Sequence, residues 1–180
     1  MSRDRKTPDE KALERSLCER IEMGRNAHGK IAITQSTSGV ISLLDLLNGT
    51  QPKIVEDDSD WNTHKNLSQD LFGLITPDIV LRSSRAKENR IIIEVKKTSP
   101  FTHTELNASQ VLRYFLHLLA TTDQKSASGI RRAILLAAPE SWFKSANAVP
   151  WRHFLKYYGP LAFQFDITLG EILLDSLQAE

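Results

Sequence analysis

Three consecutive isoleucines, at 91–93, run directly into Glu94, Val95 and Lys96. Residues 90–97 predict a β-strand, and its unbroken apolar start indicates that the strand is deeply buried. Side chains alternate along a strand, so Glu94 and Lys96 share one face. Because a buried charge is costly unless it is paired or bound to a metal ion, this strand predicts a partner for both residues. The alternative is an ordinary ion pair on a solvated sheet face.

The rest of the chain alternates between helical and extended patterns. Helices are expected at 8–24, 38–48, 104–121 and 141–158, the last with an interruption near Pro150, and a short helix is expected in the C-terminal tail. Strands are expected at 71–75, 78–82, 90–97, 132–138 and 161–167. This order predicts an α/β fold with a central mixed sheet flanked by helices, in which an antiparallel meander precedes the crossovers. The length of 180 residues fits one domain, 1–180.

The composition narrows the class of protein. A hydrophobic content of 41% and a charged content of 25% are close to the average of globular domains. The one cysteine, Cys18, excludes an intrachain disulfide and a zinc finger built on paired cysteines. No apolar run approaches the roughly 20 residues of a membrane span. We therefore expect a cytoplasmic protein with no membrane partner.

Charge is balanced overall but uneven along the chain. The formal net charge is +1, so the total charge does not by itself indicate a nucleic-acid-binding protein. Basic residues nevertheless gather at 82–90 and again at Lys96 and Lys97. A local basic surface of this kind can hold a phosphate backbone.

Asp78, directly after Pro77, opens the strand expected at 78–82. If this strand pairs with the next one through a turn at 83–89, the carboxylates of Asp78 and Glu94 lie near each other, beside Lys96. Paired carboxylates repel unless a divalent cation lies between them. Mg²⁺ prefers oxygen ligands and keeps water molecules that can react. The cluster therefore predicts a Mg²⁺ or Mn²⁺ site.

These residues resemble a known family motif. Pro77-Asp78, followed by Glu94-Val95-Lys96, resembles the motif that names the PD-(D/E)XK nuclease superfamily. Gln110 and Tyr114 lie four residues apart, on one face of the helix expected at 104–121. They resemble the QxxxY element of RecB-type nucleases in that superfamily. The resemblance covers about 70–138 and implies a restriction-endonuclease-like core.

The resemblance also implies roles for individual residues. Asp78, Glu94 and the backbone carbonyl of Val95 would hold the metal ion, and Lys96, Gln110 and Tyr114 would assist catalysis. In the superfamily a glutamate on the helix before the core often completes the metal site. The sequence offers four glutamates on the helix expected at 8–24: Glu10, Glu14, Glu19 and Glu22. At about 100° per residue, Glu10 and Glu14 lie nearest the apolar face, and we choose Glu14 as the ligand.

The implied activity is metal-dependent hydrolysis of phosphodiester bonds, with DNA as the expected partner. Three alternatives stay open: a metal-dependent RNA endonuclease, a catalytically inactive relative that binds nucleic acid or scaffolds a complex, and a coincidental motif. Many enzymes of this fold act as dimers, so a homodimer or a larger nuclease complex is a further expectation. His64 lies 14 residues before Asp78 (78 − 64). Some viral cap-snatching endonucleases use a histidine upstream of the motif as a metal ligand. The simpler alternative is that His64 is a solvated residue of a polar loop.

Overall fold

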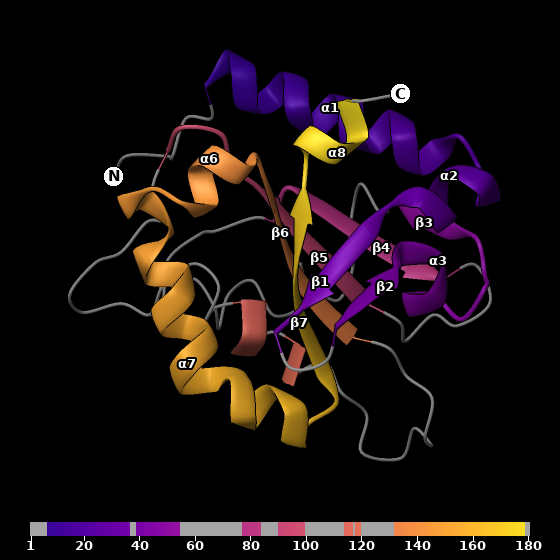
Figure 1. The fold of residues 1–180 in the computed structure, drawn as a ribbon. Coiled ribbons are helices and arrows are strands. Elements are labelled where there is room, and N and C mark those ends of the chain that lie inside the picture. Colours follow the sequence, from indigo (N-terminus) through magenta and orange to yellow (C-terminus); the bar gives the residue numbers. More distant parts are fainter. Residues whose placement is uncertain are drawn as a thin grey trace, which may run out of the picture.

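The computed structural model describes residues 7–36, 39–54, 77–83, 90–99, 114–116, 118–119 and 132–178. The strands are β1 (Ala32–Gln35), β2 (Val40–Ser42), β3 (Pro52–Ile54), β4 (Ile79–Ser83), β5 (Arg90–Val95), β6 (Arg132–Ala138) and β7 (Ile167–Leu173). The helices are α1 (Pro8–Glu22), α2 (Arg25–Lys30), α3 (Leu43–Leu46), α6 (Glu140–Phe143), the 3₁₀ helix η1 (Ala146–Ala148), α7 (Val149–Gln164) and α8 (Asp175–Gln178). Residues 114–116 and 118–119 are also helical. The predicted α/β class with a mixed sheet is confirmed (Figure 1).

The described strands form one seven-stranded sheet in the order β2-β1-β7-β6-β5-β4-β3. β3, β4 and β5 follow one another as an antiparallel meander. β5, β6 and β7 are then parallel neighbours, and such neighbours need crossover connections. A meander therefore precedes the parallel strands, as predicted, but its first described strand is β3, in a region where no strand was expected. β1 lies antiparallel to both β7 and β2 and extends the sheet on the other side.

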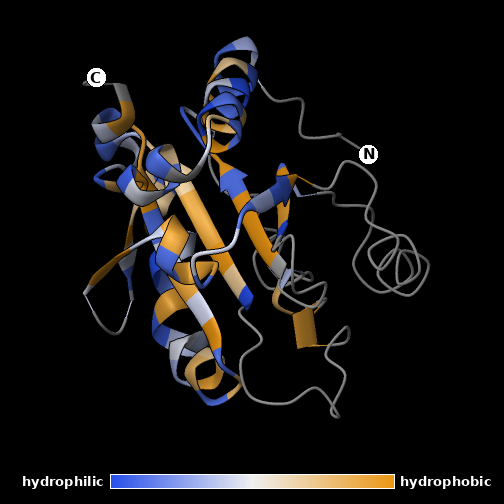
Figure 2. Cartoon of the chain, turned by 90° about the vertical axis from the view of Figure 1, so that its right-hand side faces the viewer, coloured by the Kyte–Doolittle hydropathy of each residue, from blue (hydrophilic) through white to orange (hydrophobic). Residues whose placement is uncertain are grey.

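Helices pack on both faces of the sheet, so the central strands are buried on both sides (Figure 2). One apolar cluster joins the sheet to α1 and α3, and it includes the side chains of Ile91, Ile93 and Val95. The other joins the sheet to α6, α7 and the helical residues Tyr114, Phe115 and Leu118, and it includes Ile92. The alternation predicted for this strand is thus confirmed, and it places Glu94 and Lys96 on the α7 side.

The first helix begins with a capping box. The Thr7 hydroxyl accepts a hydrogen bond from the Glu10 amide at 3.2 Å, and the Glu10 carboxylate accepts one from the Thr7 amide at 3.4 Å. Pro8 in the first turn has no amide to satisfy there. The helix ends at Glu22, and Gly24 follows with a φ of 106°. The predicted helix at 8–24 is confirmed with a slightly earlier end.

The helix expected at 38–48 is wrong in its first part. Val40 to Ser42 form β2, paired antiparallel with β1, because β-branched Val40 and Ile41 fit a pleated edge strand. Only the four residues of α3 are helical, and Ser42 caps them. Asn48 and Gly49 then turn the chain with φ values of 54° and 72°.

The strand expected at 161–167 is also wrong, because α7 continues to Gln164 and β7 begins at Ile167. Phe154, Tyr158 and Ala162 recur every four residues on the buried side of α7, so the helix keeps its packing through this region. The helix expected at 141–158 is divided into α6, η1 and α7. The strand expected at 71–75 lies outside the described residues. Within the described ranges, no helix is both long and apolar enough to cross a membrane.

Candidate active site

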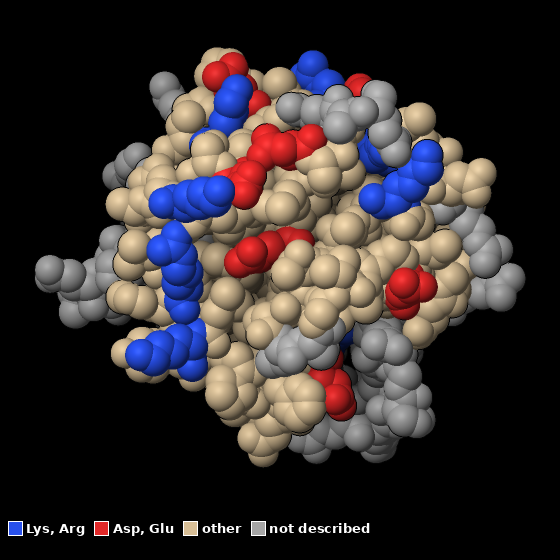
Figure 3. All heavy atoms as spheres, in the orientation of Figure 1, with Lys and Arg blue, Asp and Glu red and all other residues tan. Residues whose placement is uncertain are grey.

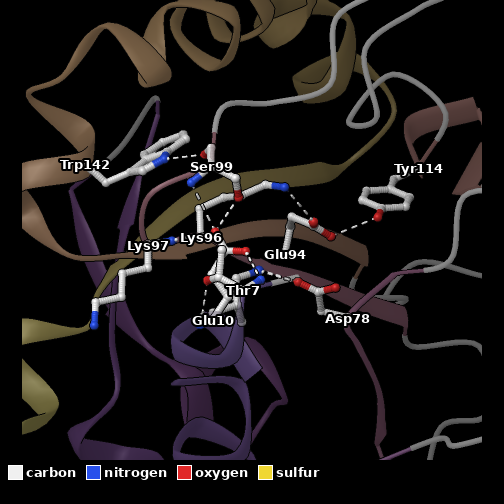
Figure 4. Close-up of polar contacts among 10 residues, drawn as sticks. Thr7, Glu10, Asp78, Glu94, Lys96, Lys97, Ser99, Tyr114 and Trp142 are labelled. Atoms are coloured by element: carbon white, nitrogen blue, oxygen red, sulfur yellow. Dashed lines mark hydrogen bonds and ion pairs between the residues drawn. The ribbon is translucent and has the colours of Figure 1, made fainter. Parts of the chain in front are cut away.

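The meander brings Asp78 opposite Glu94. Ile79 pairs with Ile93 and Val80 with Ile92, and one further step in this register places Asp78 across from Glu94. Asp78 Oδ2 accepts a hydrogen bond of 2.8 Å from the Val95 amide. Figure 4 shows the two carboxylates directed toward the same side of the strands. The proximity predicted from the hairpin is therefore present.

Polar contacts inside the protein hold both carboxylate oxygens of Glu94. Its Oε1 lies 3.2 Å from Lys96 Nζ, and its Oε2 accepts a hydrogen bond of 2.8 Å from the Tyr114 hydroxyl. Glu94 is 2% exposed and Lys96 is 5% exposed. An ion pair on a solvated sheet face would leave both side chains in water. The burial therefore excludes that alternative for Glu94 and Lys96.

Tyr114 reaches the site from the helical residues at 114–116. Its side chain is fully buried and packs with Phe115 and Leu118 in the apolar cluster beneath α7. The ring is therefore fixed by packing while its hydroxyl contacts Glu94. Two further residues that the sequence predicted for the site lie outside the described residues. They are Gln110 and His64.

Glu10 on α1 contacts the chain just after β5. Glu10 Oε1 accepts hydrogen bonds from the amides of Lys97 at 3.1 Å and Ser99 at 3.2 Å, and from the Ser99 hydroxyl. Burial raises the pKa of Glu10, but the hydrogen bonds from Ser99 and Lys97 and the charge of Lys96 outweigh it and lower the pKa below its usual value. Glu10 is therefore a buried anion that fixes the position of the segment carrying Lys96.

Glu10 is the glutamate of α1 that contacts the segment after β5, whereas the sequence favoured Glu14 as the glutamate of the site. Glu14 lies one helical turn further along α1 and is half-buried. Its role as a metal ligand stays a prediction. The Thr7-x-x-Glu10 spacing of a capping box marks Glu10 in the sequence, but only as a structural residue. Its contact with Ser99 joins positions 89 apart, and no local pattern encodes it.

The opposite layer contacts the same segment. Trp142 Nε1, on α6, donates a hydrogen bond of 2.9 Å to the Ser99 carbonyl. Asn147 Nδ2, on η1, donates one of 2.9 Å to the Thr98 carbonyl. Residues 96–99 are therefore held between α1 and the α6–η1 region, as Figure 4 shows for Glu10 and Trp142. Neither Ser99 nor Trp142 was among the site residues predicted from the sequence.

The described donors suit a hard divalent cation. Asp78 and Glu94 supply carboxylate oxygens, and Mg²⁺ is commonly bound through only one or two carboxylates while it keeps several waters. The amide and carbonyl of a strand residue point to the same neighbour, so the Val95 carbonyl is expected on the Asp78 side, where the Val95 amide bonds. Among the residues that the structure describes, no three His, Cys, Asp or Glu side chains form a complete ligand set. Asp78, Glu94 and Val95 therefore fit a partly hydrated Mg²⁺ or Mn²⁺.

No family model, no curated protein and no solved structure matches this chain. The fold and the site define its class by themselves. It is an α/β protein in which the buried side chains of Glu94, Lys96 and Tyr114 lie beside the half-buried Asp78 at the junction of β4 and β5.

Proposed function

We propose that this chain is a metal-dependent nuclease of the PD-(D/E)XK type that hydrolyses phosphodiester bonds in DNA. The observation that carries the proposal is the pairing of β4 with β5, which sets Asp78 opposite Glu94 and buries Lys96 against Glu94. We further propose a restriction-endonuclease-like core. Its support is the order along the chain of the β3–β4–β5 meander, the helical residues at 114–116 and 118–119, and the parallel strand β6.

In this proposal Asp78, Glu94 and the Val95 carbonyl hold Mg²⁺ or Mn²⁺, which when bound supplies Lewis acidity for the phosphate and a more acidic water. Asp78 is already oriented by the Val95 amide. Glu94 is oriented on both oxygens, by Lys96 and by Tyr114. Such fixed ligands need little rearrangement, and this favours tight positioning of a substrate phosphate.

Lys96 supplies positive charge where negative charge develops on the phosphate. Its ammonium group is buried and lies 3.2 Å from Glu94. A cation in a site with little water stabilises a charged transition state more strongly than a cation in solvent does. The contacts of Glu10 with Lys97 and Ser99 hold the backbone that carries Lys96. Gln110 remains a predicted further contact from the helix.

A cleavage assay with matched variants tests this proposal. The purified protein is incubated with Mg²⁺ or Mn²⁺ and with single- and double-stranded DNA and RNA. Asp78→Asn and Lys96→Met are each expected to lower the cleavage rate by roughly 100-fold or more. Calorimetry is expected to show weaker Mn²⁺ binding for Asp78→Asn and retained binding for Lys96→Met. Glu19→Gln and Lys30→Met, on exposed positions of α1 and α2, are the controls and are expected to match the wild type.

Three outcomes would count against the proposal. A folded wild-type protein that cleaves none of these substrates is not a nuclease of this class. Activity that persists in both variants belongs to another site or to a contaminant. Cleavage of RNA alone would keep the chemistry and replace the substrate.

A further inference from the structure

The outer surface of α7 is basic and aromatic. Over residues 141–165 the sequence contains no Asp or Glu. Arg152, His153, Lys156 and Tyr157 are exposed on α7, and we call these four residues the α7 outer face. Figure 3 shows Lys and Arg side chains in a row along the edge of the molecule where α6 and α7 lie in Figure 1. The chain has a net charge of only +1, so this is a local concentration of cations.

The four side chains form two neighbouring pairs. Arg152 and Lys156 are one helical turn apart, as are His153 and Tyr157. The His153 and Tyr157 ring centroids are 6.3 Å apart, and Lys156 Nζ lies 5.8 Å from the Tyr157 centroid. Tyr157 is 69% exposed. Cations beside an exposed aromatic ring are the combination with which proteins hold a nucleic-acid strand, since the cations bind phosphates and the ring stacks on a base.

The α7 outer face is connected to the candidate active site through α6. The Arg152 guanidinium donates a hydrogen bond to the carbonyl of Phe143, at the end of α6. Trp142, the preceding residue of α6, donates to the Ser99 carbonyl. Ser99 lies three residues after Lys96. A nucleic-acid strand bound along α7 would therefore lie on the layer of α6 and α7, which also supports residues 96–99.

We propose that the α7 outer face binds the sugar–phosphate backbone of a nucleic acid. Binding of a nucleic acid to the α7 outer face does not depend on the proposed nuclease function. The role of this face in guiding a substrate to Asp78 and Glu94 does rest on that function. A linear polyanion fits because Arg152 and Lys156 lie along one helical edge and no acidic side chain interrupts α7. The inner side of the helix is committed to the protein core through Trp151 and Phe154.

Binding without cleavage tests this proposal. Fluorescence anisotropy measures the affinity of the full chain for labelled single- and double-stranded DNA and RNA in EDTA, over a series of salt concentrations. Lys156→Gln and Arg152→Gln are each expected to weaken binding and to lower the slope of log affinity against log salt by about 0.9 for duplex DNA. Tyr157→Ala is expected to weaken single-strand binding about tenfold with the slope unchanged. Lys30→Gln and Lys53→Gln, exposed cations on α2 and β3, are the matched controls and are expected to bind like the wild type.

The outcomes separate this proposal from the nuclease proposal. Binding that depends on Lys156, in a protein that cleaves nothing, supports the surface and overturns the nuclease. Cleavage with unchanged affinity and salt slope in all three α7 variants overturns the surface alone. Arg152→Gln could disturb the contact with Phe143, whereas Lys156→Gln removes only an exposed charge, so an effect of Arg152→Gln alone also counts against the surface. Binding to anionic phosphatidylserine vesicles without binding to any nucleic acid would overturn it in favour of a membrane surface.

Discussion

The Tyr114 hydroxyl donates a hydrogen bond of 2.8 Å to Glu94 Oε2, while Glu94 Oε1 lies 3.2 Å from Lys96 Nζ. Each carboxylate oxygen thus has its own partner, so the orientation of Glu94 depends on both. Tyr114→Phe removes one of them and leaves the ring in place. We expect the free energy of unfolding to fall by about 1–3 kcal/mol, because a buried charged acceptor loses a donor. We also expect cleavage to fall about tenfold, because 1.4 kcal/mol in the transition state is a factor of ten.

Tyr158→Phe is the matched control for this change. Tyr158 belongs to the same apolar cluster, and its ring stacks on Phe154 with centroids 5.2 Å apart. Denaturant unfolding and the cleavage rate are measured for both variants. If the two tyrosines respond alike, Tyr114 contributes packing only and has no part in orienting Glu94.

Glu10 is the buried charged side chain of α1 and is expected to contribute strongly to stability. It accepts hydrogen bonds from the Lys97 and Ser99 amides and from the Ser99 hydroxyl, and it is 2% exposed. Glu10→Ala removes the acceptor for these donors and half of the capping box with Thr7. We expect a loss of at least about 2 kcal/mol in the free energy of unfolding.

Urea unfolding measures this loss, with Glu19→Ala as the control. Glu19 is an exposed carboxylate on the same helix, and its removal is expected to change stability by no more than about 0.5 kcal/mol. Glu10→Gln keeps a carbonyl oxygen as an acceptor and is expected to fall between Glu10→Ala and the wild type. Equal stability of Glu10→Ala and Glu19→Ala would show that the Glu10 contacts contribute nothing.

The same carboxylate predicts how stability depends on pH. Burial raises the pKa of Glu10, but the hydrogen bonds from Ser99 and Lys97 and the charge of Lys96 leave the pKa of the folded protein below the ordinary value of 4.5. As the pH falls below 4.5, the unfolded chain takes up the proton first. The stability that Glu10 contributes is therefore complete above that pH and is lost as the pH falls through the lower, folded-state pKa.

Unfolding free energies measured from about pH 6 down to about pH 3 check this expectation. The wild type is expected to lose stability over the acid part of the range, and Glu10→Gln is expected to lose less. Other carboxylates also titrate there, so the informative quantity is the difference between the two proteins. A difference that does not change with pH would contradict the lowered pKa.

The central part of the fold could be predicted because its signals are local. The three isoleucines at 91–93 and the apolar run at 132–138 indicate buried strands, and both are present as β5 and β6. The apolar pattern of two paired strands restricts their register, so the proximity of Asp78 and Glu94 could also be predicted.

The rest could not be predicted because it depends on contacts between distant positions. β1 and β2 have four and three residues, too few for a clear alternation, and β1 is fixed by its pairing with β7 at the other end of the sequence. At 161–167 large apolar residues alternate with Ala162, Gln164 and Asp166, which is typical of a strand, yet residues 161–164 continue α7. The contacts of Glu10 with Ser99 and of Trp142 with Ser99 span 89 and 43 positions.

Gly170, on β7, has no space for a larger side chain, because β1 and β6 pack closely against it. A Cβ atom at this position would lie 2.6 Å from Ile33 Cγ2 on β1, 3.2 Å from Leu135 Cδ2 on β6 and 3.2 Å from the Thr34 carbonyl oxygen. The two side chains would have to move, and the backbone oxygen cannot move without disturbing the pairing of Thr34 with β7. We expect Gly170→Ala to lower the free energy of unfolding by about 1–3 kcal/mol.

Gly29→Ala is the matched control, since a Cβ atom at Gly29 would meet only Leu44 Cδ2, at an ordinary contact distance of 4.0 Å. Gly29 is exposed in α2, where alanine favours the helix over glycine by about 1 kcal/mol. The same substitution is therefore expected to destabilise the protein at Gly170 and to stabilise it at Gly29. Thermal and urea unfolding of the two variants measure both signs. A neutral Gly170→Ala would mean that β1 does not pack against β7 as closely as the sheet order requires.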